Sequence, residues 1–315
     1  MRKEKGITLI ALVITIIVLL ILAGVAIATL TGDNGLLQKA TTAKKENEEA
    51  KELELIKLAV SAAQVAGEGN ITKDNLENEL KINFNDNTIT IGEIEDGWSY
   101  NSYKIDKSGK VDKLLPKEYQ QVEYLESTGT QYIDTGLAIS NNDNLYIKFN
   151  IPQYTDRGCI AGAGTTSTSN VIAIIMYNNG ATFRIMKNER YNDLCPIPME
   201  DIIGIEIKDR KIIVKKENTA EVHEYRYDLD AYSTPNMYLF RGNNVLNNAK
   251  CKIYNYIVYK QEKKKMELIP CKSTTTVINA NGGSVPANTK GLYDTVEGKF
   301  YTNQGTGEFI AGPEV

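Results

Sequence analysis

The longest apolar segment of the chain runs from Ile7 to Leu30, within a stretch, residues 6–31, that contains no charged residue. As an α-helix rising about 1.5 Å per residue, this segment is about 36 Å long, which exceeds the roughly 30 Å hydrocarbon core of a bilayer. A helix also satisfies its own backbone hydrogen bonds in lipid. The pattern therefore predicts a transmembrane helix over residues 7–31.

Basic residues at the start of the chain set the expected orientation of this helix. Arg2, Lys3 and Lys5 precede it, against a single acid, Glu4. Positive charge is retained on the cytoplasmic side of membranes. We therefore expect a single-pass membrane protein with a cytoplasmic N-terminus and an extracellular C-terminal part.

A second helical pattern follows the apolar segment. The glycines of Gly32-Asp33-Asn34-Gly35 interrupt the first helix, and residues 32–66 then alternate at a helical period as an amphipathic helix or stalk. One face carries apolar residues, namely Leu37, Ala40, Ala43, Ala50, Leu53, Ile56 and Val60.

Residues 67–113 predict a small α+β unit. A short helix is expected over Thr72–Leu80, followed by strands at Thr88–Ile91 and Ser99–Ile105. The turn Asp106-Lys-Ser-Gly109 predicts a hairpin with a return at Lys110-Val111. Trp98, the only tryptophan, is expected to anchor the core of this unit.

After Leu114-Leu115-Pro116 the period of the apolar pattern changes to two, and clusters of Asn, Gly and Pro separate short segments. Many short strands with turn signals predict an antiparallel β-sandwich over residues 114–315. The expected strands are Leu145–Ile151, Val171–Tyr177, Thr182–Met186, Ile202–Lys208, Lys211–Lys215, Val222–Tyr227, Met237–Phe240, Lys250–Tyr259 and Met266–Pro270.

Composition excludes several classes of function. A net charge of −4 and a pI of about 5.4 do not favour a nucleic-acid partner. The only histidine, His223, lies in an expected strand, which excludes a histidine-cluster metal site and leaves little room for a Ser-His-Asp triad. Tyrosine outnumbers phenylalanine 18 to 6, which suits β surfaces that are partly hydrated.

The remaining candidate chemistry is sparse. Cys159, Cys195, Cys251 and Cys271 have no C-x-x-C spacing, so zinc is not expected, and both disulfides and free buried thiols stay open. Asn141-Asn-Asp-Asn144 offers oxygen ligands for calcium, with a plain turn as the alternative. We otherwise expect no cofactor. Lys260–Lys265 is interpreted as a charged hairpin tip.

The start of the chain resembles a type IV prepilin. A basic leader, residues 1–6, ends in Gly6, and the apolar run begins at once with Ile7-Thr8-Leu9-Ile10. The resemblance implies that a prepilin peptidase cuts between Gly6 and Ile7, and that residues 32–113 form a pilin-like unit able to contact other pilin-like subunits. Ala11 stands where pilins carry a glutamate, which leaves polymerisation open. An uncleaved signal-anchor, and a signal peptide cut after Ala26-Ile27-Ala28, are the alternatives.

The start and end of the expected sandwich resemble concanavalin A-like and laminin G-like domains of bacterial surface proteins. The similar segments are Leu115–Gly136, Leu268–Cys271, Gly291–Asp294 and Gly298–Phe309. The resemblance implies a jelly-roll domain over residues 114–315 whose first and last strands are neighbours. The family contains binders of sugars and proteins, and glycanases with a Glu-x-Asp-x-x-Glu strand. Glu206-Ile-Lys-Asp209 does not fit that spacing, so we expect no enzyme.

Three hypotheses of function follow. The favoured one is a membrane-anchored, prepilin-like surface protein whose lectin-like domain binds an extracellular glycan or protein, as a minor subunit of a pilus. The second is a structural pilus or pseudopilus subunit or spacer without a small ligand. The third is a degenerate glycan-acting enzyme. Ligand-binding residues stay unassigned, because they lie in loops that sequence alone does not place.

Overall fold

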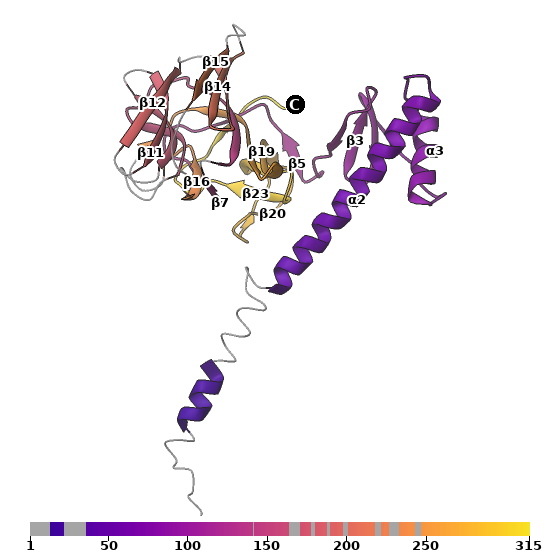
Figure 1. The fold of residues 1–315 in the computed structure, drawn as a ribbon, viewed down its shortest axis with the longest axis horizontal. Coiled ribbons are helices and arrows are strands. Elements are labelled where there is room, and N and C mark those ends of the chain that lie inside the picture. The colour runs from indigo at the N-terminus through magenta and orange to yellow at the C-terminus, as the bar shows by residue number, and fades with distance from the viewer. Residues whose placement is uncertain are drawn as a thin grey trace, which may run out of the picture. The chain divides into compact units, whose positions relative to one another are not determined.

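The structure is a computed structural model of the chain and describes residues 13–21, 36–140, 142–163, 171–177, 180–187, 190–197, 201–217, 222–226, 233–242 and 247–315. The chain divides into two compact units, Met1–Leu114 and Leu115–Val315. Each unit has a hydrophobic core of its own, so the two are described separately (Figure 1).

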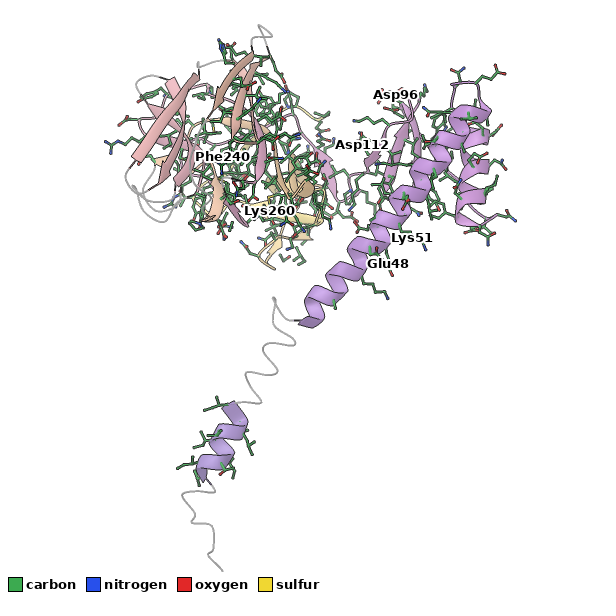
Figure 2. The ribbon with its side chains drawn as sticks, in the orientation of Figure 1. Glu48, Lys51, Asp96, Asp112, Phe240 and Lys260 are labelled. Atoms are coloured by element: carbon green, nitrogen blue, oxygen red, sulfur yellow. The ribbon has the colours of Figure 1, made fainter. Side chains whose placement is uncertain are left out.

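Two helices form the α part of the first unit, α2 (Leu36–Ala66) and α3 (Lys73–Phe84). The bounds of α2 agree with the helical pattern expected up to residue 66. One face of its second half is buried against Leu76 and Leu80 of α3, whereas Glu48 and Lys51 project from the helix surface (Figure 2). The buried residues of α2 recur at helical spacing, as Ile56, Ala59, Val60 and Ala63.

Local sequence explains where α3 begins and ends. The Thr72 hydroxyl accepts a hydrogen bond from the Asn75 amide, and the Asn75 side chain accepts one from the Thr72 amide. This reciprocal cap satisfies donors that the first helical turn leaves free. Asn85, in the left-handed conformation with φ 52°, ends the helix.

A four-stranded antiparallel sheet completes the first unit, with strands β1 (Gly92–Ile94), β2 (Gly97–Tyr100), β3 (Tyr103–Asp106) and β4 (Val111–Lys113). The single strand predicted over Ser99–Ile105 is wrong, because Asn101, at φ 51°, turns the chain between β2 and β3. The strand predicted at Thr88–Ile91 is also absent, although Ile89 and Ile91 are buried. Trp98 lies in this core, as predicted.

Most of the predicted transmembrane segment lies outside the described residues. Residues 13–21 of it are helical. Among the helices that the structure describes, none combines the length and the hydropathy that a membrane crossing requires. The leader residues Arg2, Lys3, Lys5 and Gly6, the cleavage partner Ile7, and Ala11 all lie outside the described residues.

Within its described residues the second unit contains a seven-stranded sheet with the order β12-β11-β10-β9-β16-β7, and β17 pairs parallel with β9. Its strands are β7 (Ile133–Ser140), β9 (Gly158–Ala163), β10 (Val171–Tyr177), β11 (Gly180–Lys187), β12 (Arg190–Ile197), β16 (Ser233–Leu239) and β17 (Asn247–Asn248). Ala161, Gly162 and Ala163 are buried in β9.

The same unit contains an eleven-stranded sheet with the order β15-β14-β13-β8-β18-β19-β22-β23, in its described part, and with β5, β6 and β24 attached at one end. Its strands are β5 (Tyr119–Gln121), β6 (Leu125–Glu126), β8 (Asn144–Asn150), β13 (Ile202–Lys208), β14 (Lys211–Lys216), β15 (Val222–Arg226), β18 (Lys252–Lys260), β19 (Lys263–Ser273), β22 (Lys290–Asp294), β23 (Lys299–Thr302) and β24 (Ile310–Ala311). A separate ribbon pairs β20 (Val277–Ile278) with β21 (Ser284–Val285).

The two sheets share one core, so the second unit is an antiparallel β-sandwich consistent with a jelly roll, as predicted. Phe149 and Tyr256 contribute from the eleven-stranded sheet, and Ile174 and Leu239 from the seven-stranded sheet. Phe240 lies within the sandwich (Figure 2), with its ring centre 4.9 Å from that of Phe309. Residues near the end of the chain therefore take part in the main core.

The two ends of the sandwich are neighbours, as the resemblance implied, although the last strand pairs with the second strand and the first strand, β5, pairs with β19. β6 pairs antiparallel with β24, and Val122 forms an isolated bridge with Glu314. The Val315 amide donates to the carbonyl of Gln121 at 3.2 Å. This pairing brings residues 308–314 over one end of the eleven-stranded sheet.

Candidate functional site

Five polar and aromatic side chains gather on the outer side of β7 and β16, and we call this group, Tyr132, Asp134, Asn236, Tyr238 and Arg241, the tyrosine surface. Strand alternation explains it, because Ile133, Thr135, Met237 and Leu239 are buried while the residues between them face outward. Tyr238 is the register partner of Asp134, so the two strands place these side chains together.

The aromatic part of the tyrosine surface is a pair of tyrosines with a cation beside it. The ring centres of Tyr132 and Tyr238 are 5.9 Å apart, with an angle of 30° between the ring planes. The guanidinium carbon of Arg241 lies 4.7 Å from the centre of the Tyr132 ring. All three side chains are partly exposed, which leaves ring surface and N–H donors open to a ligand.

Asp134 organises the polar part. Its Oδ1 accepts a hydrogen bond from the Gly136 amide at 2.8 Å, and its Oδ2 lies 3.5 Å from the amide nitrogen of Asn236. Burial, followed by the negative charge of Asp134, raises the pKa of Tyr238. The Tyr238 hydroxyl therefore stays protonated and can donate a hydrogen bond at neutral pH.

Hydrogen bonds to residues 303–308 hold the segment that carries Tyr132. The Gln131 side chain donates to the Glu308 carbonyl at 2.9 Å, and the Tyr132 amide donates to Asn303 Oδ1 at 3.2 Å. The Thr130 hydroxyl donates to the Thr306 carbonyl at 2.8 Å. These bonds join the beginning of the sandwich to its end, so the tyrosine surface is on rigid structure.

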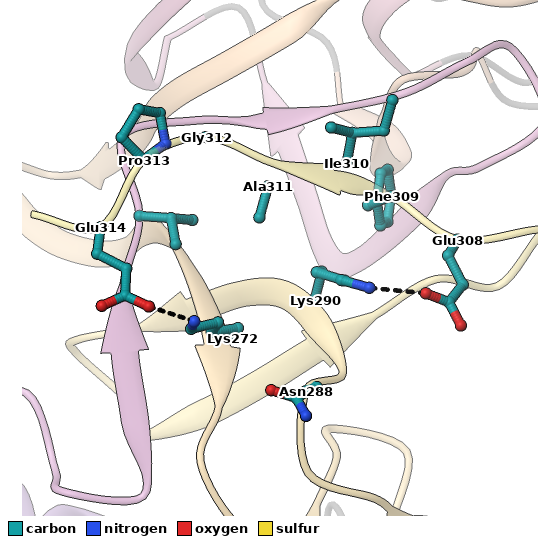
Figure 3. Close-up of a pocket in the computed structure, with 11 residues that line it drawn as sticks. Lys272, Asn288, Lys290, Glu308, Phe309, Ile310, Ala311, Gly312, Pro313 and Glu314 are labelled. Atoms are coloured by element: carbon teal, nitrogen blue, oxygen red, sulfur yellow. Dashed lines mark hydrogen bonds and ion pairs between the residues drawn. The ribbon is translucent and has the colours of Figure 1, made fainter.

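A groove of about 740 Å³ lies along the last residues of the chain (Figure 3). Its walls come from the end of β19, the start of β22 and the segment that contains β24. The lining residues are Val122, Lys272, Asn288, Lys290, Glu308, Phe309, Ile310, Ala311, Gly312, Pro313 and Glu314. It has the size of a small-molecule site.

Two ion pairs cross this groove. Lys272 pairs with Glu314, and Lys290 Nζ lies 2.7 Å from Glu308 Oε2 (Figure 3). Each lysine side chain is 29% exposed, whereas those of Glu314 and Glu308 are 60% and 79% exposed. The ion pair with Lys290 lowers the pKa of Glu308. The lysines are thus part of the groove, and the glutamates lie mostly in solvent.

Residues singled out from sequence have ordinary partners. Asp143, of the calcium candidate, accepts a hydrogen bond from the Ser140 amide at 2.7 Å and pairs with Lys260 at 3.5 Å, while Asn141 lies outside the described residues. Glu206 pairs with Lys215 at 3.2 Å. Asp209, at φ 52°, forms the turn between β13 and β14. His223 is a strand residue of β15.

Across the described part of the chain, no three His, Cys, Asp or Glu side chains come together in a way that could hold a metal ion.

The cysteines that the structure describes carry free, buried thiols: Cys159, Cys251 and Cys271. Burial raises the pKa of each, to about 12 for Cys271, so none is a reactive thiolate at neutral pH. The side chain of Cys195 lies outside the described residues. Cys251 lies directly before β18, and Cys271 lies within β19.

Neither the tyrosine surface nor the lysine pair was singled out from sequence. Tyr132 and Asp134 are close in sequence, but their partners on β16 are about a hundred residues away, with 102 positions separating Asp134 from Asn236. Lys272 and Lys290 are isolated basic residues in sequence. Only strand pairing brings either group together.

Comparison with solved structures gives remote similarities. The chain is similar to domains LG4-5 of the mouse laminin alpha1 chain at 8% identity and a TM-score of 0.30, over 51% of this chain and 48% of the laminin fragment, about half its length. A SAP-like pentraxin from Limulus polyphemus gives 12% identity and a TM-score of 0.34, over 62% and 94%. Galectin-Ib from Xenopus laevis gives 10% identity and a TM-score of 0.25, over 41% of this chain and 98% of the galectin.

No protein-family model matches the chain, and no curated protein is similar to it in sequence. The sandwich architecture follows from the strand pairing and the shared core described above.

Proposed function

We propose that the sandwich is a glycan-binding module of a cell-surface protein, and that the tyrosine surface is its binding site. The observation that carries this proposal is the grouping of two tyrosine rings, a carboxylate, an amide and a guanidinium on one outward face. The resemblance of residues 114–315 to lectin-like domains agrees with it.

The chemistry of this surface fits a sugar. A pyranose ring has an apolar C–H face, which packs against a tyrosine ring, and hydroxyls around its edge. The carboxylate of Asp134 accepts hydrogen bonds from such hydroxyls, while the Asn236 amide and the Arg241 guanidinium donate to them. A protein ligand that offers the same groups is the alternative occupant.

A glycan array on the full chain in neutral detergent tests this site. We expect Tyr238→Ala and Asp134→Asn to lower the affinity for any glycan bound by at least about tenfold, because each removes a direct contact. Tyr259→Ala, a partly exposed tyrosine of β18 outside the surface, is the matched control. Equal losses in all three variants, or no glycan bound by the wild type, would refute the proposal.

We further propose that residues 7–31 anchor the protein in the membrane after a prepilin peptidase has cut between Gly6 and Ile7. The basic leader with Arg2, Lys3 and Lys5, and the apolar run that follows Gly6, support this. Mass spectrometry of the mature N-terminus is the test. An intact leader on protein whose sandwich is digested by protease added to whole cells would exclude cleavage but retain the anchor.

The first unit supports a related proposal, that the protein joins a filament as a minor pilin-like subunit. A long helix packed against a small antiparallel sheet has the arrangement that the prepilin-like start implies. Ala11 argues against a role as the major subunit, because an unpaired N-terminal ammonium in an apolar bundle is costly. Electron microscopy with a C-terminal tag separates tip, lateral and non-filament locations. A tagged protein that never associates with filaments would remove this role.

We expect binding without hydrolysis. Glu206 is neutralised by Lys215, and Asp209 serves a turn. Incubation of the full chain with each bound glycan, followed by a reducing-end assay, tests the degenerate-enzyme alternative. New reducing ends that disappear in Asp134→Asn would favour it.

A further inference from the structure

Lys272 and Lys290 are register partners on the neighbouring strands β19 and β22. Side chains directly opposite each other in an antiparallel pair are about 5 Å apart at Cβ, and like charges in that position repel. The backbone pairing of the two strands fixes the Cβ positions of both lysines, while their ammonium groups extend to Glu314 and Glu308 at opposite ends of the groove (Figure 3). The groove therefore contains two lysines whose long side chains start from adjacent positions on the sheet.

Both counter-charges come from one segment of chain. Glu308 and Glu314 lie on either side of β24 in sequence, and each forms an ion pair with one lysine of the groove (Figure 3). Both glutamates are mostly in solvent, and exposed ion pairs contribute little to stability. An external anion can therefore replace them at low cost, and the flexible lysine side chains can then turn toward it from their fixed positions on the sheet.

The rest of the groove complements a sugar unit. Asn288 offers an amide beside the lysines. Ile310, with 48% of its surface exposed, and Pro313 give an apolar wall. A ligand that fits has one oxyanion to bridge the two ammonium groups and a compact body with polar edges.

We propose that this groove is a second binding site, specific for an acidic saccharide whose oxyanion bridges Lys272 and Lys290 and displaces Glu308 and Glu314. This site is separate from the tyrosine surface and does not depend on it. A lysine ammonium is a point charge that accepts a carboxylate or a phosphate equally, so the test separates these two sources.

Isothermal titration calorimetry on the full chain in neutral detergent provides the test. The probes are a galacturonic acid trisaccharide, its methyl ester, which is the same sugar without charge, and glycerol phosphate. We expect the trisaccharide to bind, the methyl ester to bind at least about tenfold more weakly, and binding to weaken as the salt concentration rises from about 50 mM to about 500 mM. Binding of glycerol phosphate alone would assign the site to phosphorylated saccharides and overturn the carboxylate form.

Two double variants give opposite predictions. K272Q/K290Q should lower affinity for the acid at least about tenfold, whereas E308Q/E314Q should raise it several-fold by removing the competing carboxylates. K299Q/E297Q, an ion pair at 2.7 Å outside the groove, should change nothing. If K272Q/K290Q fails to fold, the affinity of E308Q/E314Q for the acid still tests the proposal. Unchanged or weaker binding in E308Q/E314Q would overturn the proposal. The two ion pairs would then serve only to hold the segment that contains β24 against the sheet.

Discussion

Asp294, at the end of β22, is a carboxylic acid in surroundings that disfavour its charge. It is fully buried; Oδ1 accepts hydrogen bonds from the amides of Glu267 and Val296, and Oδ2 has no partner among the described residues. Burial raises its pKa from 3.8 to about 6, and the backbone hydrogen bonds offset part of that rise. The residue therefore titrates close to physiological pH.

This shift predicts a pH dependence of stability. Between pH 3.8 and 6 the folded protein holds this proton more tightly than the unfolded chain, so its stabilising effect is complete below 3.8 and is lost as pH rises through 6. We expect Asp294→Asn, which cannot ionise, to gain about 1–3 kcal/mol relative to wild type between pH 4 and pH 7. Urea unfolding at both pH values measures it. Parallel curves for the two proteins would contradict the assignment.

Tyr256 presents the opposite case, a neutral group buried without a partner. Its ring fills the sandwich core, but its hydroxyl has no hydrogen-bond partner within the described part of the chain. An unsatisfied hydroxyl in such a place costs about 1–3 kcal/mol, so Tyr256→Phe should raise the free energy of unfolding by about 1 kcal/mol. Thermal unfolding is the measurement, and a lower Tm than wild type would show that the hydroxyl is bonded in solution.

At the scale of elements, the β18–β19 hairpin is closed by residues that its turn does not favour. Gln261 and Glu262 form the two-residue loop between the register partners Lys260 and Lys263, with φ values of 50° and 63°. Positive φ at both positions defines a type I′ turn, for which Asn-Gly is the preferred pair. The sequence indicated a charged hairpin tip here, and the structure confirms it.

Replacing this loop should stabilise the sandwich. We expect Gln261→Asn with Glu262→Gly to raise the free energy of unfolding by about 1 kcal/mol, because strain at positive φ is relieved. Elsewhere the chain places glycine at such a position, since Gly298 has a φ of 70°. Urea denaturation gives the value. A loss of stability would mean that the side chains of the native loop make contacts that outweigh the strain.

Periodicity predicted elements well where one face decides the structure. The helical pattern ending at Ala66 and the alternation of Ile202–Lys208 match α2 and β13 residue for residue at those bounds. It failed at Ser99–Ile105, where alternation continues through a turn that only the backbone at Asn101 reveals. It also failed at Thr88–Ile91, whose buried isoleucines pack without strand pairing. An apolar pattern indicates which side chains are buried. Whether the segment forms a strand also depends on an adjacent strand that can pair with it.

At the scale of the whole molecule, sequence predicted the sandwich but not its surfaces. Four similar segments implied that the first and last strands are adjacent, and the last strand, β24, pairs with the second strand, β6. The tyrosine surface and the lysine pair each depend on which strands are neighbours and in which register. A shift of one residue would turn every side chain to the opposite face, so these sites required coordinates.

Two adjacent residues at the start of the segment that contains β24 should differ sharply in their contribution to stability. Phe309 is buried against Phe240 in the main core, whereas Ile310 beside it is 48% exposed. We expect Phe309→Ala to cost about 3–5 kcal/mol and Ile310→Ala less than about 1 kcal/mol. Differential scanning calorimetry of the sandwich transition compares the two. Similar losses would show that the segment is held mainly by its β24 backbone pairing.

The pairing of β6 with β24 has a consequence for biosynthesis. Residues at the two ends of the sandwich are far apart in sequence, with 195 positions between Gln120 and Val315. The ribosome therefore makes β6 long before its partner β24, and β6 stays unpaired with β24 during that time. Contacts between such distant positions form late and slowly. Nascent chains halted anywhere before Phe309 should therefore remain incompletely folded, prone to aggregation and sensitive to protease. A translocation machinery that needs an unfolded polypeptide would therefore meet one until β24 has been synthesised.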